Sequence, residues 1–319
     1  MNKELYTQII NKIKEANNIL IITHENPDGD AIGSACVMAE LAGILDKNFD
    51  IFCHDEPEPA FLFLSHSDKI NNDKNKIDFS KIDLVLAVDC ARLERSRIEV
   101  EIKAKNLFII NIDHHISNDN FGDINLVDGE AASSTQIIYE FLKHNNIEVN
   151  QRMANCILTG IMTDTGNFSY AATNSQTFDV ASEMLIEGAN VRSILNYTSK
   201  NKNLKTLKAW GFALSQLRHN KEYDIAYTIL ASKDLDSLGV NKQDLEGLSS
   251  FLNVLKDAKI VMVLYELGDG RVKGSFRTND DNIDVSKIAQ VFGGGGHKKA
   301  AGFEVEGKLE EIEGGWKII

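Results

Sequence analysis

The sequence contains few cysteines and prolines and lacks any long apolar run. Its four cysteines, Cys36, Cys53, Cys90 and Cys156, stand far apart and form no C-x-x-C pair. We therefore expect reduced and mostly buried thiols, with neither a disulfide framework nor a thiolate zinc site. Apolar runs such as residues 260–265 fall well short of the ~18 residues that a membrane-spanning helix requires. These absences argue against membrane proteins and small disulfide-rich proteins.

Positive charge is also scarce, because 34 Lys and Arg stand against 47 Asp and Glu and give a net charge of −13. An acidic surface repels long polyanions, so we expect no binding to long duplex nucleic acid. A short phosphorylated substrate needs only a locally positive site. Residues 1–18 mix charged and apolar residues at helical spacing, without the uncharged core of a signal peptide. We therefore expect a cytoplasmic protein that does not associate with membranes.

The rest of the composition is typical of a globular protein, and 319 residues suggest two domains. In the first half, short runs rich in Ile, Leu and Val alternate with helical patterns. The predicted strands are residues 19–23, 84–88 and 107–112, and the predicted helices are residues 31–45 and 134–142. This alternation predicts βαβ units and hence an α/β domain with a mainly parallel sheet over residues 1–189.

The second half of the chain follows a different pattern. Residues 190–220 are polar and basic at helical spacing, and we interpret them as a helical connector. Beyond it, strands are predicted at residues 225–230, 259–267, 271–277 and 300–305, and a helix at residues 285–292. These elements predict a second, smaller α+β domain over residues 221–319.

Acidic and imidazole side chains gather where the predicted parallel strands end and at two helix boundaries. In chain order they are His24, Asp28, Asp30, Asp89, Asp113, His114, His115 and Asp164. Sites in parallel α/β sheets are built at the carboxyl ends of the strands. A local alternative is that Asp30 caps the helix beginning at residue 31 while Asp28 lies in an ordinary turn. Likewise, the hydroxyl residues 133–135 are interpreted as caps of the following helix.

A shared crevice would place four of these carboxylates, Asp28, Asp30, Asp89 and Asp164, close enough to force protonation or to open the fold. Two divalent cations would cancel that charge. Carboxylate oxygens and imidazole nitrogens suit Mn²⁺, with Mg²⁺, Co²⁺ and Fe²⁺ as alternatives. Two such ions can acidify a shared water and neutralise a phosphoryl oxygen. The residues therefore predict two-metal hydrolysis of a phosphoester.

These motifs, in this order, resemble those of the DHH phosphoesterases, a family named after the triplet found here at residues 113–115. The likeness covers nearly the whole chain and also includes residues 24–30 (HENPDGD), 88–89 (VD) and 163–168 (TDTGNF). Within the family, the chain is most similar to the stand-alone nanoRNase and 3′-phosphoadenosine 5′-phosphate phosphatase subgroup. The resemblance implies manganese ligands at His24, Asp28, Asp30, Asp89, His114 and Asp164, with Asp89 bridging the two ions. It also implies two catalytic residues, His115 facing the substrate phosphate and Asp113 orienting its neighbours.

A glycine run marks the second domain. Gly293, Gly294, Gly295 and Gly296 precede His297, and the bare N–H groups of such a loop can wrap an anion, although a flexible turn is the alternative. In the family that the chain resembles, this DHH-associated domain binds substrate. The resemblance therefore implies substrate-binding residues at the four glycines, Ser275, Arg277 and His297.

The resemblance implies a manganese-dependent phosphodiesterase or phosphatase. Its expected substrates are short oligoribonucleotides, linear or cyclic dinucleotides and 3′-phosphoadenosine 5′-phosphate, which it would cleave to mononucleotides. An inorganic pyrophosphatase or exopolyphosphatase is one alternative, but the glycine-rich segment counts against it. A RecJ-like single-strand exonuclease is another, but the length and the charge of −13 leave little room for an added nucleic-acid-binding module. A sensor that binds dinucleotides without cleaving them is the non-enzyme alternative. The sequence does not determine the oligomeric state, and a homodimer is one possibility.

Overall fold

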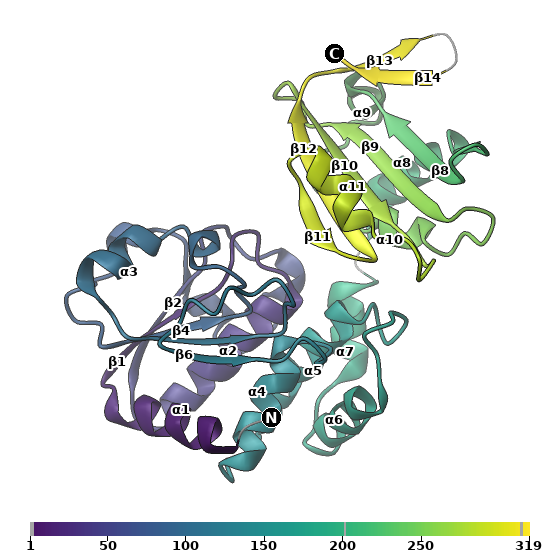
Figure 1. Cartoon of the computed structure of the whole chain (residues 1–319). Helices are drawn as coiled ribbons and strands as arrows, with labels where there is room; N and C mark the ends of the chain where they lie inside the picture. Colours follow the sequence, from purple (N-terminus) through teal and green to yellow (C-terminus); the bar gives the residue numbers. More distant parts are fainter. Residues whose placement is uncertain (1–2, 201, 313–314) are drawn as a thin grey trace. The chain divides into compact units, whose positions relative to one another are not determined.

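The computed structural model describes residues 3–200, 202–312 and 315–319. It divides the chain into two compact units, Met1–Asn201 and Lys202–Ile319, which are coloured from purple to teal and from green to yellow in Figure 1. None of the helices in the described part of the chain has the length and apolar character needed to span a membrane. All four cysteines are buried with free thiols, as the sequence predicts.

The first unit is built on a six-stranded sheet whose order is β3-β2-β1-β4-β5-β6, with every pair of neighbours parallel. Its strands are β1 (Asn18–Ile22), β2 (Asn48–Phe52), β3 (Ile70–Asn71), β4 (Leu84–Val88), β5 (Ile109–Asp113) and β6 (Ile124–Val127). The parallel sheet predicted from the sequence is thus confirmed. The three predicted strands become β1, β4 and β5, which are adjacent, so their carboxyl ends lie side by side.

Helices cover both faces of this sheet (Figure 1). They are α1 (Lys3–Glu15), α2 (Gly29–Ile44), α3 (Glu99–Lys105), α4 (Ser134–His144), α5 (Gln151–Asp164), α6 (Ser175–Ile186) and α7 (Val191–Thr198). Successive strand residues point to opposite faces. Accordingly, Ile19 and Ile21 of β1 pack in the core with α2, α4 and α5, whereas Leu20 and Ile22 pack in the core with α3. Burial on both faces explains why the central strands β1, β4 and β5 are near-continuous apolar runs.

Helices α2 and α5 approach each other closely because glycine occupies the contact. A Cβ atom placed on Gly33 of α2 would lie 2.7 Å from the backbone oxygen of Cys156 on α5. Helix α2 begins at Gly29, and α5 ends at Asp164. The packing of the two helices therefore fixes the first turn of α2 relative to the last turn of α5. Both ends carry predicted metal ligands.

The second unit has a mixed sheet of order β11-β12-β10-β9-β8-β7, in which only the β8–β9 pair is parallel among the described strands. Its strands are β7 (Arg218–Asn220), β8 (Ile225–Leu230), β9 (Ile260–Glu266), β10 (Arg271–Arg277), β11 (Gly295–His297) and β12 (Ala300–Glu306), followed by the hairpin β13 (Leu309–Ile312) and β14 (Gly315–Ile318). Its helices are α8 (Leu204–Ser215), α9 (Ser232–Leu238), α10 (Leu248–Leu252) and α11 (Val285–Val291). Within the predicted connector, α7 belongs to the first unit and α8 to the second.

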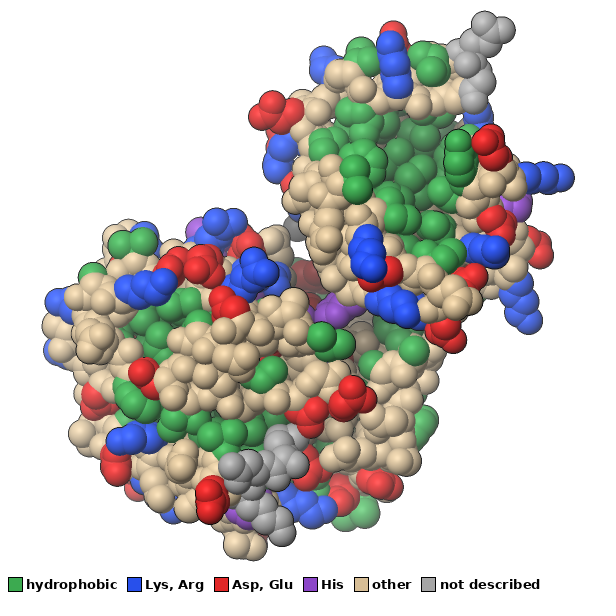
Figure 2. All heavy atoms as spheres, viewed as in Figure 1, with side chains coloured by type: hydrophobic (Ala, Val, Ile, Leu, Met, Phe, Trp, Pro, Cys, Tyr) green, Lys and Arg blue, Asp and Glu red, His purple; other side chains and the backbone are tan. Residues whose placement is uncertain are grey.

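Apolar residues pack against both faces of the second sheet. One core joins the sheet to α8, α9 and α10, and the other joins it to α11. The face toward α11 is only partly covered, and Figure 2 shows apolar side chains gathered there. The partly buried Ile225, Tyr227 and Met262 belong to this second core.

Candidate metal centre

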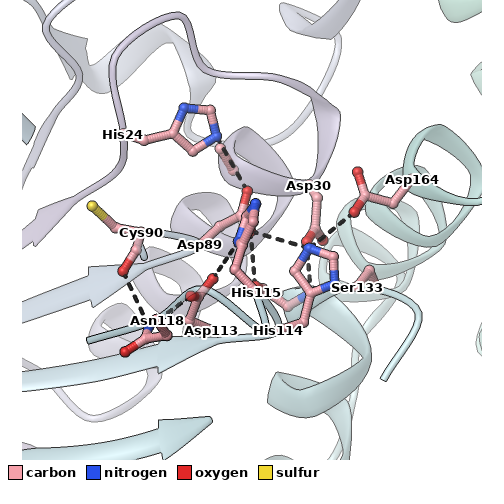
Figure 3. A network of polar contacts seen from close by, with 12 residues as sticks. His24, Asp30, Asp89, Cys90, Asp113, His114, His115, Asn118, Ser133 and Asp164 are labelled. Carbon is pink, nitrogen blue, oxygen red and sulfur yellow. Dashed lines mark hydrogen bonds and ion pairs between the residues drawn. The ribbon is translucent and has the colours of Figure 1, made fainter. Parts of the chain in front are cut away.

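Six residues with metal-ligating side chains come together where β1, β4 and β5 end. His24 and Asp89 follow β1 and β4, and His114 follows β5, while Asp28 and Asp30 lie at the start of α2 and Asp164 ends α5. They form two groups, each with its ligand atoms within 4.8 Å of one another: His24, Asp28 and Asp89, and Asp30, His114 and Asp164. Asp89 and His114 also form such a group with His115. Figure 3 shows the side chains of five of them pointing toward one another.

The carboxylate of Asp89 lies between the two groups. Its Oδ2 is 3.4 Å from Nε2 of His24, and its Oδ1 is 3.6 Å from Nε2 of His114. The backbone N–H of Asp89 donates to the carbonyl of Ile112 at 2.9 Å, which ties this residue to the end of β5. Each oxygen of one carboxylate therefore faces a different group, the arrangement expected of a bridging ligand.

The imidazoles of His24 and His114 are held through their other nitrogen. Nδ1 of His24 donates to the carbonyl of Glu25 at 2.6 Å, and Nδ1 of His114 lies 3.4 Å from the carbonyl of Ala131. Metal-ligating histidines commonly use one nitrogen for such a bond and present the other to the ion. Here Nε2 of both rings points toward Asp89, which fits a role as metal ligand.

Asp28 and Asp30 have different partners. Asp28 is the N-cap of α2, and its Oδ1 accepts from the N–H groups of Asp30 at 3.0 Å and Ala31 at 3.1 Å. The alternative that made Asp30 the helix cap is therefore wrong. Asp30 is fully buried, and its carboxylate accepts from the N–H groups of Ser134 at 2.5 Å and Thr135 at 3.0 Å, at the start of α4.

Burial and mutual repulsion act on the carboxylates of the centre. Burial raises the pKa of Asp30 well above its usual value, and the charges of Asp89 and Asp164 raise it further. Burial also raises the pKa of Asp164 to about 6, with the charge of Asp28 adding to the effect. For Asp89, burial is outweighed by the neighbouring imidazoles, which hold its pKa well below the usual range. The centre thus concentrates negative charge that divalent cations would neutralise.

The same charges act on the imidazoles. Burial works to lower the pKa of His24, but the hydrogen bond to Asp89 and the charge of Asp28 raise it to about 9. His114 also has a pKa well above its usual value, because Asp164 and Asp89 outweigh its burial. Buried carboxylate oxygens and imidazole nitrogens are donors typical of divalent transition metals. The residues present therefore fit a metal centre.

Asp113 lies beside the centre and orients His115. Its Oδ1 is 2.8 Å from Nδ1 of His115, and its Oδ2 accepts from Nδ2 of Asn118 at 2.6 Å. Asn118 also donates to Oδ1 of Asn111 at 2.8 Å. Asp113 is fully buried, so these bonds fix both its oxygens. The sequence gives no sign of the part played by Asn118, which is a single amide in a loop.

Two further residues near the centre were not predicted from the sequence. The Oγ atom of Ser134 donates to Oδ1 of Asp89 at 2.9 Å. A guanidinium nitrogen of Arg95, in the 3₁₀ helix Leu93–Ser96, lies 3.4 Å from Nδ1 of His24. The capping role predicted for residues 133–135 is confirmed for Ser133, whose side chain accepts from the N–H of Gln136 at 3.1 Å.

The predicted substrate-binding residues of the second unit meet on one face of its sheet. Arg277 of β10 and His297 of β11 are both in register with Ala300 of β12, while Ser275 is in register with Gly302. Residues opposite each other on neighbouring strands point to the same face. The side chain of Arg277 also donates to Oγ of Ser250 on α10, at 3.4 Å.

The glycine run does not form the open loop that the sequence predicts. Gly295 and Gly296 belong to β11 and pair with β12, while Gly293 and Gly294 link α11 to this strand. A Cβ atom on Gly294 would lie 2.1 Å from the backbone oxygen of Gly302, and one on Gly296 would lie 2.5 Å from that of Ala300. Glycine is needed here because the two backbones approach closely.

Comparisons with known proteins agree with this geometry. The model of the DHH family, N-terminal domain, matches residues 18–161, and the model of the DHHA1 domain matches residues 222–314. A crystal structure of an exopolyphosphatase-related protein from Bacteroides fragilis has a TM-score of 0.90 at 24% identity and covers 98% of this chain and 93% of that one. At that identity, the likeness supports the fold alone.

Two curated relatives are similar over nearly the whole chain. The probable bifunctional oligoribonuclease and PAP phosphatase NrnA of Streptococcus mutans is 29% identical over 299 residues, which cover 93% of this chain and 92% of that protein. The bifunctional oligoribonuclease and PAP phosphatase NrnA of Bacillus subtilis is 26% identical over 302 residues, which cover 94% of this chain and 93% of that protein. With both domain models matched in order, the chain belongs to the DHH family of phosphoesterases, as a DHH domain followed by a DHHA1 domain.

Proposed function

We propose that this DHH phosphoesterase uses two divalent cations to hydrolyse short oligoribonucleotides, linear or cyclic dinucleotides and 3′-phosphoadenosine 5′-phosphate to mononucleotides. The observation that carries the proposal is the pair of adjacent ligand groups, which the carboxylate of Asp89 connects: Asp89 belongs to the first group, and its Oδ1 lies 3.6 Å from Nε2 of His114 in the second. The names of the relatives, oligoribonuclease and PAP phosphatase, support this class of substrate.

The donor set assigns residues to each ion. His24, Asp28 and Asp89 would hold one cation, and Asp30, His114 and Asp164 would hold the other. Asp89 would also contact the second cation, because its Oδ1 lies 3.6 Å from Nε2 of His114. Oxygen and imidazole donors favour Mn²⁺, with Mg²⁺, Co²⁺ and Fe²⁺ as alternatives. When bound, the two ions would acidify a water and neutralise charge on the phosphate.

The remaining residues would bind and orient the substrate. Asp113 holds Nδ1 of His115, so the ring is kept in one orientation, in which we propose that it contacts a phosphate oxygen and stabilises its charge. In the second unit, Arg277, Ser275 and His297 share one face of the sheet, and we propose that they bind the phosphate and the remainder of the nucleotide. A net charge of −13 favours short substrates, because an acidic surface repels a long strand.

Product analysis with the chelator-treated protein and added Mn²⁺ tests this function. The substrates are diadenylate, cyclic diadenylate, 3′-phosphoadenosine 5′-phosphate, inorganic pyrophosphate and a single strand of ~20 nucleotides. We expect mononucleotide products and a steep fall in kcat/KM from the dinucleotide to the ~20-nucleotide strand. Equal kcat/KM on both lengths would favour a single-strand exonuclease. Preferred cleavage of pyrophosphate would favour a pyrophosphatase, and binding without cleavage would favour a sensor.

A further inference from the structure

The first turn of α4 connects two ligand carboxylates that come from different elements. The Oγ atom of Ser134 donates to Oδ1 of Asp89, at the end of β4, at 2.9 Å. The backbone N–H of the same residue donates to Oδ2 of Asp30, on α2, at 2.5 Å. Ser134 and Asp30 are fully buried, and Asp89 is 1% exposed. A single residue therefore contacts one carboxylate from each of two elements.

These bonds restrain both carboxylates. Oδ1 of Asp30 accepts from the N–H of Thr135 at 3.0 Å, so each of its oxygens has one backbone donor. Hydrogen bonds to ionised carboxylates are stronger than those between neutral groups, and the start of a helix favours negative charge. Like charges close together repel each other, and these fixed donors hold the carboxylates of Asp30 and Asp89 in place.

We propose that Ser134 is a positioning residue that sets the separation of Asp30 and Asp89, and with it the spacing of the two cations. The inference rests on the metal centre of the proposed function and adds a residue that is not itself a ligand. Partners that orient metal ligands typically contribute about 10–100-fold to metal affinity. The hydroxyl of Ser134 is expected to act in this way through Asp89, which both ions would share.

Helix capping is a separate task, carried out by the preceding residue. Ser133 accepts from the N–H of Gln136 at 3.1 Å, and its hydroxyl lies 2.9 Å from that of Thr135. Two adjacent serines in the same helix turn thus provide a matched pair. One hydroxyl stabilises the helix, and the other contacts a carboxylate of the centre.

The test is a Mn²⁺ titration of the chelator-treated full chain, with free Mn²⁺ followed by electron paramagnetic resonance. We expect the wild type to bind two ions and Ser134→Ala to bind at least one of them about 10–100-fold more weakly. The spectrum of the coupled ion pair should also change in this variant. Ser133→Ala should unfold at a lower temperature in chelator, because it loses a cap, but should bind Mn²⁺ as the wild type does.

Thermal unfolding in chelator shows whether Ser134→Ala is folded before metal is added. We expect it to fold, because the substitution removes one hydroxyl oxygen and adds no bulk. Unchanged Mn²⁺ affinities and an unchanged coupled spectrum in Ser134→Ala would overturn the role of Ser134. An equal loss of affinity in Ser133→Ala would also overturn it, because helix integrity would then be the cause. The titration needs no substrate, so a wild type that binds two ions but cleaves no dinucleotide contradicts the proposed function instead.

Discussion

A methyl group added at Gly160 should weaken metal binding while leaving the first unit folded. Gly160 lies in α5, one turn before Asp164. A Cβ atom at this position would lie 2.3 Å from Oγ1 of Thr135 and 2.4 Å from Oδ1 of Asp30. Real Cβ contacts are essentially never under 3.0 Å, so the side chains of Thr135 and Asp30, or the helices that carry them, must shift by at least about 0.7 Å. This shift would displace the carboxylate of Asp30 and the first turn of α4, which carries Thr135.

Gly160→Ala changes both the stability of the fold and the affinity for Mn²⁺, and the size of each change can be estimated. Overpacking a core costs ~1–3 kcal/mol of unfolding free energy, and alanine regains ~1 kcal/mol over glycine inside a helix. The free energy of unfolding in chelator should therefore fall by at most ~2 kcal/mol. Displacing Asp30 and its donors should weaken Mn²⁺ binding ~10–100-fold. Turnover at a fixed Mn²⁺ concentration should fall ~100-fold, because small displacements of positioned groups are costly for catalysis.

Gly43→Ala is the matched control. Gly43 is also in a helix of the first unit, α2, but no described atom lies within 4 Å of a Cβ placed there. This variant should gain ~0.5–1 kcal/mol in unfolding free energy and should bind Mn²⁺ unchanged. Denaturant unfolding in chelator, Mn²⁺ titration and dinucleotide hydrolysis measure the three quantities. Wild-type Mn²⁺ affinity and turnover in Gly160→Ala would refute the reasoning.

Three further predictions test other parts of the centre and the second unit. Asp89→Asn should abolish hydrolysis and lower the Mn²⁺ content per chain, because one carboxylate faces both ligand groups; metal analysis showing two bound ions and full turnover would contradict this. Arg277→Ala should lose a charge-assisted contact of ~1.5–3 kcal/mol, which is about ten- to hundredfold in kcat/KM for a dinucleotide. It should spare a small chromogenic phosphodiester, and equal losses on both substrates would count against a substrate-binding role. In chelator, the pKa of His24 rises from 6.5 to about 9 on folding, so its contribution to stability is complete below pH 6.5 and disappears as the pH rises through 9. Mn²⁺ should then raise the Tm more at about pH 8.5 than at about pH 6, where protons compete for the site, and an equal shift at both values would contradict this account.

The strands that carry the centre can be predicted from local sequence patterns. Near-continuous runs of Ile, Leu and Val predict β1, β4 and β5, because strands buried on both faces need apolar residues at most positions. The rule that sites form at the carboxyl ends of parallel strands then selects the residues that follow these runs. The structure places His24, Asp89 and His114 there. Strands β2, β3 and β6 are not predicted from the sequence, because polar residues interrupt the apolar residues in β2 and β6 and β3 is only two residues long.

The hydrogen-bond partner of each polar group, by contrast, depends on how distant segments pack together. The sequence allowed Asp30 to cap its own helix, but its carboxylate instead accepts from Ser134, 104 positions away, because α2 packs against the start of α4. Likewise, Gly295 and Gly296 form a strand only because β12 supplies the pairing backbone. Periodicity and apolar runs are local properties of a chain, so they can be recognised in the sequence without knowing the fold. Hydrogen bonds between distant segments depend on how those segments pack, and it is this packing that holds the carboxylates of the metal centre together.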